Sequence, residues 1–216
     1  MVMSSSRSTR FTRQVDSREL AAGQARVVTL RRVYPAPLED LWDACTNPER
    51  LPRWFLPITG ELRLGGRYQL EGNASGTIER CEPPHGFTAS WEYGGSVSWI
   101  ELRLSPGRNG GTRFELDHIT LVAGDDKWAQ FGPGAVGVGW ELGLMGLALH
   151  PRSGAAVDPA QARAWSASEP GRRFASLSSQ RWRDADVAAG RDPSEADAAG
   201  ERTAAFYSGA SLGTAS

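Results

Sequence analysis

Residues 33–56 constrain the fold of this chain more than any other stretch. They read VYPAPLEDLWDACTNPERLPRWFL. The apolar residues after Pro37 recur at helical spacing, which predicts a short amphipathic helix with an acidic first turn. Pro48 and Pro52 prevent that helix from continuing, because proline lacks an N–H and restricts the residue before it. The stretch therefore predicts a strand end, a short helix, a kink and a short aromatic-rich helix at Trp54 and Phe55.

Alternating apolar and polar residues, interrupted by turn residues, predict a series of β-strands along the following part of the chain. The adjacent glycines Gly65 and Gly66 are typical of a hairpin, and Pro83-Pro84 ends another strand. Strands joined mainly by tight turns favour an antiparallel meander. The predicted strands are residues 25–34, 58–64, 67–72, 75–82, 87–93, 96–104 and 112–122.

A second apolar feature, residues 127–150, carries a rough helical stripe that includes Trp128, Trp140 and Leu144. Its length approaches that of a membrane span, but its glycines and Glu141 favour a buried helix. Glycine destabilises a helix by about 1 kcal/mol relative to alanine. We expect the glycines to be retained here because small residues allow close packing against a sheet.

The two ends of the chain differ from the middle in composition. Residues 1–24 are rich in Ser and Arg and predict a disordered leader, with a basic arm for an acidic partner as the alternative. Residues 151–216 predict a helical extension with helices at 159–167, 169–189 and 193–207. These helices hold too few apolar residues for a core of their own. We expect them to pack on the main domain, residues 25–150, with dimerisation through the same surface as the alternative.

The stretch 33–56 also resembles the opening of the START-like (SRPBCC) superfamily, which has the helix-grip fold. Its most similar branch is named after the activator of the heat-shock-protein-90 ATPase, and the similarity extends more loosely to about His150. The matching positions are Tyr34, Ala36, Pro37, Trp42, Ala44, Thr46, Pro48, Leu51 and Trp54. The resemblance implies an α+β helix-grip fold, a curved antiparallel sheet around a long C-terminal helix, here followed by the helical extension. The resemblance says less about function than about fold, because the superfamily includes lipid carriers, cyclases and co-chaperones.

Composition argues against several classes of protein. Lys and Arg number 24 and Asp and Glu 25, so a broad nucleic-acid surface, which needs a basic excess, is not expected. The chain contains 2 cysteines. Because no secretion signal accompanies them, we expect reduced thiols and a cytoplasmic location. No membrane span is expected, and the oligomeric state stays open.

The sequence also lacks a convincing motif for binding a cofactor or a metal ion or for hydrolase catalysis. Gly132, Gly134 and Gly137 match a G-x-G-x-x-G pattern, but no apolar strand precedes them and Pro133 lies inside the loop. The histidines are far apart in sequence, and no G-x-S-x-G elbow is present. We therefore expect no metal, no other cofactor and no catalytic residue.

The feature that remains is an aromatic-lined space. A curled antiparallel sheet against a long helix leaves an internal volume that suits a small apolar or amphipathic ligand, although the same aromatic residues would also fill a core. His118 is the leading polar residue of this wall, with a purely structural histidine as the alternative, and Glu79, Glu92 and Glu141 are weaker candidates. The predicted ligand-binding residues are Trp54, Phe55, Tyr68, Trp91, Trp99, Phe114, Leu116, His118, Trp140 and Leu144.

Three classes of function follow. The first is a protein that binds a small hydrophobic or amphipathic molecule. The second, implied by the resemblance, is an interaction module with a chaperone partner. The third is a cyclase- or hydratase-like enzyme, which is the least favoured because no pair of titratable residues has a diagnostic spacing.

Overall fold

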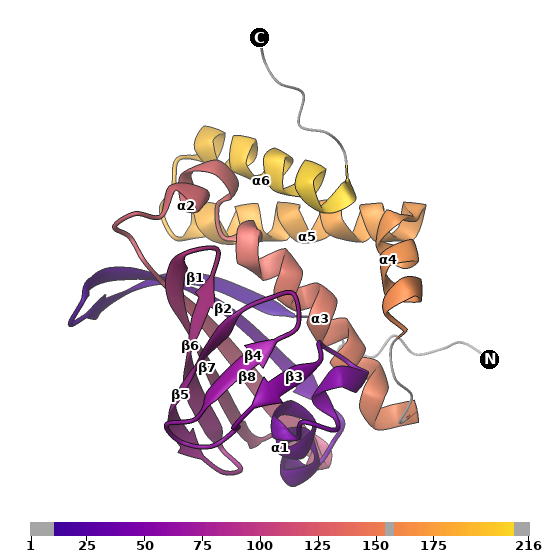
Figure 1. Ribbon diagram of the computed structural model, residues 1–216. Coiled ribbons are helices and arrows are strands. Elements are labelled where there is room, and N and C mark those ends of the chain that lie inside the picture. The colour runs from indigo at the N-terminus through magenta and orange to yellow at the C-terminus, as the bar shows by residue number, and fades with distance from the viewer. Residues whose placement is uncertain (1–10, 154–157, 210–216) are drawn as a thin grey trace. The chain divides into compact units, whose positions relative to one another are not determined.

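The computed structural model describes residues 11–153 and 158–209. Its strands are β1 (Thr12–Leu20), β2 (Gly23–Tyr34), β3 (Ile58–Gly60), β4 (Arg67–Leu70), β5 (Ser75–Glu82), β6 (Gly86–Tyr93), β7 (Ser96–Pro106) and β8 (Thr112–Leu121). Its helices are α1 (Leu38–Thr46), α2 (Asp126–Phe131), α3 (Gly134–Ser153), α4 (Pro159–Ala167), α5 (Glu169–Ala188) and α6 (Pro193–Ser208), with 3-10 turns η2 (Leu51–Arg53) and η3 (Arg108–Gly110). Figure 1 labels these elements along the chain.

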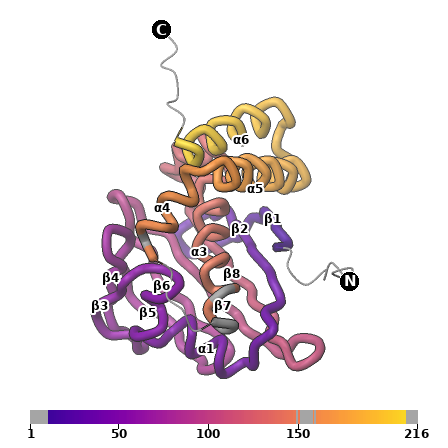
Figure 2. The backbone as a smooth tube through the Cα atoms, turned by 90° about the vertical axis from the view of Figure 1, so that its right-hand side faces the viewer, coloured from indigo at the N-terminus to yellow at the C-terminus, as the bar shows by residue number. Residues whose placement is uncertain are grey.

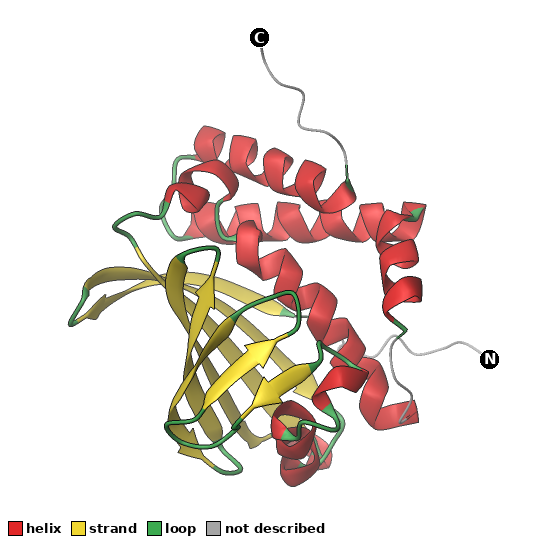
Figure 3. Cartoon of the chain, viewed as in Figure 1, coloured by secondary structure: helices red, strands yellow, loops and turns green. Residues whose placement is uncertain are grey.

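The described strands form an eight-stranded sheet with the order β1-β2-β8-β7-β6-β5-β4-β3, drawn yellow in Figure 3. Strands β3 to β7 pair antiparallel with their neighbours in sequence, as the tight turns predict. The strands predicted at 25–34, 67–72, 75–82, 87–93, 96–104 and 112–122 are confirmed within a few residues. The strand predicted at 58–64 is shorter, because Gly60 has a φ of 103° and the chain turns there.

Strand β1 corrects the prediction of a disordered leader, at least for residues 12–20. It forms the edge of the sheet beside β2 and alternates exposed with partly buried residues. An inward position of β1 is taken by a charged residue, Arg13, whose side chain is 9% exposed and is paired with Glu141. Because Arg13 and Arg18 occupy partly buried positions along with Val15 and Leu20, the sequence lacks the regular apolar alternation that marks a strand. The predicted leader at residues 1–10 lies outside the described residues.

Helix α1 forms as residues 33–56 predict. Pro37 precedes it, Glu39 and Asp40 lie in its first turn, and the Arg50 guanidinium donates to Asp40 Oδ1 at 2.9 Å after the helix has ended. The predicted aromatic-rich helix is instead the 3-10 turn η2, which ends just before Trp54. Proline inside so short a segment leaves room for one tight turn and no more.

The predicted long helix at 127–150 is interrupted near its start. Helix α2 ends at Phe131, Gly132 has a φ of 59°, and α3 begins after Pro133. A residue with positive φ followed by proline cannot continue a helical ladder, which explains the break.

Helices α4, α5 and α6 match the predicted extension. Asp158, Ser168 and Asp192 accept hydrogen bonds from backbone N–H groups of the helices that follow them, as N-caps do. Figures 1 and 2 show α5 and α6 side by side, joined by a short turn. Tyr207 Oη on α6 donates to the Ala135 carbonyl of α3 at 2.8 Å, so the extension is bonded to α3.

The chain divides into two compact units. The sheet unit contains residues 11–12, Thr29–Pro52 and Leu56–His118, and the helical unit contains Arg13–Val28, Arg53–Phe55 and residues from Ile119 onward. The helical unit thus includes β1, α3 and the C-terminal helices together. The predicted domain boundaries, 25–150 and 151–216, stay a prediction.

Candidate functional site

The sheet unit has one apolar face, and six of the predicted ligand-binding residues belong to this unit. On β8, Phe114, Leu116 and His118 alternate with Glu115 and Asp117, and all three are buried. Period-two alternation places them on one face. From the same unit, the Trp91 ring on β6 meets the His118 ring edge-on, with 6.2 Å between centroids. Trp91 is half-buried, although His118 beside it is buried.

His118 is neutral at physiological pH. Burial lowers the pKa of its imidazole to about 4, because a charged ring loses its hydration. A neutral imidazole offers one donor and one acceptor nitrogen. It therefore places polar nitrogens in an apolar wall without adding charge.

Tyr68 on β4 lies on this face as well. It pairs with Gly76 of β5, and Ile78 lies two residues further along the same face of β5. Ile78 in turn pairs with Ala89 of β6, which is two residues from Trp91 and therefore shares its face. Its hydroxyl donates to the Ser90 carbonyl at 2.7 Å. Burial raises the pKa of the hydroxyl, so Tyr68 stays protonated. Because its hydroxyl is already hydrogen-bonded within the sheet, Tyr68 contributes its ring to this face as apolar surface.

Trp99 does not belong to this wall, which corrects its place among the predicted lining residues. The register pairs Trp99 with Ser90 and Trp91 with Ser98, so the two indoles project from opposite faces of the sheet. Trp99 Nε1 donates to Glu79 Oε1 at 3.3 Å on its own side. Glu79, a weaker polar candidate, is thereby also placed away from the apolar face.

The face that carries Trp99 is charged. Arg103, four residues along the same strand, donates to Glu115 at 2.5 Å and to Asp117 at 2.7 Å, and Arg31 pairs with Glu115. These Arg side chains hold the pKa of Glu115 below its usual value against the opposing effect of burial. One face of the sheet unit is thus an ion-pair network and the other is apolar.

The helical unit holds the other four predicted residues, and it brings three of them into a stack. The Trp54 and Phe55 rings are stacked with centroids 5.4 Å apart, and Phe55 stacks on Trp140 of α3 at 5.6 Å. Phe55 and Trp140 are half-buried, whereas Leu144 is buried. Gly143 makes room for this stack, since a Cβ there would lie 3.0 Å from Phe55 Cδ2.

Glu141 is a structural residue, which removes it from the predicted polar contacts. Its side chain is fully buried, and both carboxylate oxygens accept from Arg13, each at 2.6 Å. The Trp182 indole of α5 donates to Oε1 at 2.8 Å. Neither Arg13 nor Trp182 was predicted to meet Glu141, because their contact depends on tertiary structure. Glu92, the third weaker candidate, pairs with Arg67 at 3.0 Å.

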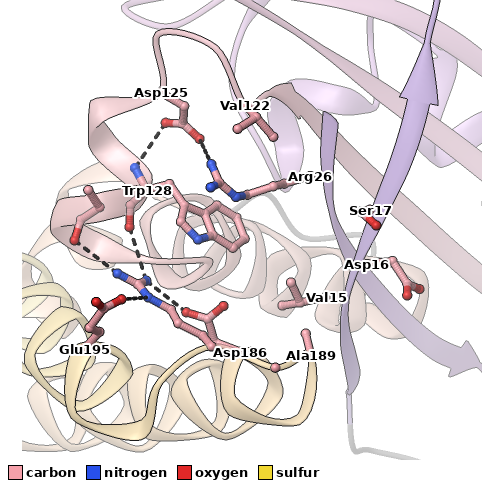
Figure 4. Close-up of a pocket in the computed structure, with 13 residues that line it drawn as sticks. Val15, Asp16, Ser17, Arg26, Val122, Asp125, Trp128, Asp186, Ala189 and Glu195 are labelled. Carbon is pink, nitrogen blue, oxygen red and sulfur yellow. Dashed lines mark hydrogen bonds and ion pairs between the residues drawn. The ribbon is translucent and has the colours of Figure 1, made fainter. Parts of the chain in front are cut away.

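A cavity of about 560 Å³ lies in the helical unit and was missed at the level of sequence. Figure 4 shows the ring of Trp128, one of the lining residues, between Arg26 and Asp186. The Arg26 guanidinium lies 4.9 Å from the ring centroid and 3.7 Å from Asp125. Arg191 pairs with Asp186 at 3.0 Å and donates to the Trp128 and Ala129 carbonyls. The residues come from β1, β2, the segment around α2 and the α5–α6 turn, so no local motif could have revealed them. The lining residues are Val15, Asp16, Ser17, Arg26, Val122, Asp125, Trp128, Ala129, Asp186, Ala189, Gly190, Arg191 and Glu195.

Other chemistries find little support in the described part of the chain. Burial raises the pKa of the Cys45 thiol to about 12, which makes it a poor nucleophile. Among the described residues, His, Cys, Asp and Glu side chains nowhere gather in threes suited to hold a metal ion. No described helix has the length and apolar character needed to cross a bilayer.

The architecture is that of an α+β helix-grip protein of the START-like class, with an antiparallel curved sheet and long C-terminal helices. The model of the family "Activator of Hsp90 ATPase homolog 1-like protein" matches residues 35–149. This chain belongs to that family, as the motif in residues 33–56 predicts.

Solved structures extend this result. The chain is similar to CalU16 from Micromonospora echinospora, whose solution structure is 37% identical, covers 87% of this chain and 100% of its own, and has a TM-score of 0.70. A crystal structure of CalU16 gives 37% identity, coverage of 84% and 98%, and a TM-score of 0.62. DynU16, a protein in the dynemicin biosynthetic locus, is 18% identical over 60% of this chain and 48% of its own, with a TM-score of 0.54, and shows the fold alone. The CalU16 match reaches beyond residues 35–149, so the similarity includes segments outside the family motif.

Proposed function

We propose that this protein binds a small hydrophobic or amphipathic molecule on the apolar face of its sheet unit. The observation that carries the proposal is the Trp91–His118 pair: a buried, neutral imidazole lies edge-on to an indole that stays half-exposed. Ligand sites are lined mainly by apolar and aromatic side chains together with a small number of polar groups, and this pair provides one of each. The free thiols Cys45 and Cys81 fit a cytoplasmic protein.

The wall favours a ligand with an apolar body and one neutral polar group. Phe114 and Leu116 offer apolar contact, and the Tyr68 hydroxyl is already bonded to the backbone. His118 would hydrogen-bond a hydroxyl or carbonyl group and would fix the orientation of the ligand. With a pKa of about 4, His118 is a weak base at neutral pH, which favours binding over acid–base catalysis.

Titration with an apolar fluorescent probe, such as an anilinonaphthalene dye, tests this proposal. Leu116→Trp adds bulk to the apolar face and should weaken binding at least about tenfold. Arg113→Trp is the matched control, because Arg113 is exposed on the same strand and faces the opposite side. Trp99→Ala should also leave binding unchanged. Equal binding by the wild type and Leu116→Trp, or none by the wild type, would favour a filled core.

A chaperone-interaction role is the second candidate, and family membership is what supports it. Native purification followed by mass spectrometry separates the two roles. A co-purified lipid or aromatic compound supports ligand binding, whereas a stoichiometric chaperone partner together with no probe binding supports the interaction module.

A further inference from the structure

The cavity of the helical unit is separate from the proposed ligand wall, because each of its lining residues belongs to the helical unit. Its volume of about 560 Å³ is in the range of pockets that hold small molecules. Trp128 provides an aromatic surface, and Val15, Ala129 and Ala189 add apolar contact. A cavity of this size with both apolar and charged walls is suited to an amphipathic ligand.

The charge of the cavity favours a cation. Its lining contains four carboxylates, Asp16, Asp125, Asp186 and Glu195, but two guanidiniums, those of Arg26 and Arg191. The carboxylates therefore exceed the guanidiniums by two. An incoming anion would be repelled by this excess.

Both guanidiniums are already engaged by the protein. Arg191 contacts Asp186, lies 3.6 Å from Glu195 and donates to two carbonyls of α2. Arg26 lies over the Trp128 ring and near Asp125. An anion would have to displace these contacts and would also be repelled by the excess of carboxylates. A cation would share carboxylates that already accept from Arg191 and Gln14, and the excess negative charge would attract it.

Three of the carboxylates line the cavity from different elements. Figure 4 shows Asp16 on the β1 side of the cavity, Glu195 on the α6 side and Asp186 between them. Asp16 and Glu195 are exposed, whereas Asp186 is 3% exposed. Burial raises the pKa of Asp186 against the opposing effect of Arg191, so added positive charge nearby would stabilise its ionised form.

We propose that this cavity binds an organic cation, an ammonium or guanidinium group carried on an apolar body. The charged group is attracted by the excess of carboxylates in the lining, which include Asp16, Asp186 and Glu195. The apolar body lies against Trp128 and Val15.

Three probes of matched shape and different charge test the proposal: phenethylammonium, 2-phenylethanol and 3-phenylpropionate. Binding is followed by NMR through the Trp128 indole N–H, assigned with Trp128→Phe. Phenethylammonium should shift this resonance saturably and bind at least about tenfold more tightly than the neutral alcohol. The carboxylate probe should not bind there.

Two double variants complete the experiment. Asp16→Asn with Glu195→Gln removes the charge excess and should weaken phenethylammonium binding about tenfold or more. Glu49→Gln with Glu201→Gln removes the same charge from exposed positions outside the cavity and should bind as the wild type does. Circular dichroism checks that each variant is folded. The proposal is overturned if the alcohol or the carboxylate matches the amine, if Trp128 does not respond, or if the Asp16/Glu195 variant binds normally.

Discussion

Glu141 connects three elements of the helical unit through its side chain. Its carboxylate is fully buried, with Arg13 bonded to both oxygens and the Trp182 indole bonded to one. Such a charge is tolerated only while all of its partners remain. The three residues therefore act together, although they come from β1, α3 and α5.

Arg13→Met should destabilise the protein by about 3–5 kcal/mol, because it leaves the Glu141 carboxylate buried without its countercharge. Chemical denaturation measures the loss, and Gln14→Met is the control on the exposed side of the same strand. The double variant with Glu141→Gln should lose less than the sum of the two single losses. A melting curve for Arg13→Met that overlays the Gln14→Met curve would disprove the role of the pair.

His118 should make stability depend on pH. Its pKa is about 4 in the folded protein and about 6.5 in the unfolded chain, so between these values the unfolded chain binds more protons. Stability should therefore be complete above about pH 6.5 and fall by up to about 3 kcal/mol as the pH drops to 4. Compared with wild type, His118→Gln should show a flatter profile in this window. Parallel profiles for the two proteins would show that burial does not depress the His118 pKa.

At the scale of elements, the glycines of α3 mark where other elements approach it. A Cβ at Gly137 would lie 2.2 Å from Trp182 Cε2, and a Cβ at Gly134 would lie 2.8 Å from Thr203 Cγ2. These contacts are with α5 and α6. Gly134 and Gly137 therefore admit side chains of the extension, whereas the sequence had led us to expect these glycines to pack against a sheet.

Gly137→Ala should destabilise the protein by about 1–3 kcal/mol, because overpacking against the Trp182 ring outweighs the higher helix propensity of alanine. Gly200→Ala is the comparison within α6. A Cβ there lies 3.2 Å from the first methylene of Arg183, so a change below about 1 kcal/mol is expected. Thermal melts of the two variants measure these losses of stability. Equal melting temperatures for Gly137→Ala and Gly200→Ala would contradict the packing argument.

The elements were largely predictable because their signals are local. The proline positions around α1, the turn glycines of the meander and the Asp192 cap each act within a few residues. Strand β1 and the Arg26–Trp128 cavity were not predictable, because they depend on partners far away in sequence. Trp99 was assigned to the wrong face for a similar reason, since one step of register reverses a side chain.

At the scale of the whole molecule, the C-terminal helices depend on residues that lie outside them. Trp182, Thr203 and Tyr207 bond to Glu141, to the Phe131 carbonyl and to the Ala135 carbonyl, respectively. Expressed alone, residues 159–216 should therefore be mostly unfolded by circular dichroism. A cooperative unfolding transition in this fragment would show instead that the extension is an independent domain.

The arrangement around Glu141 also bears on how the chain matures during synthesis. Arg13 leaves the ribosome first and Glu141 much later, and the Trp182 indole follows after a further 41 residues. A nascent chain that ends before Trp182 carries a carboxylate that must remain hydrated. The helical unit can therefore close only after Trp182 has been synthesised, whereas the residues of the sheet unit have all been synthesised by His118.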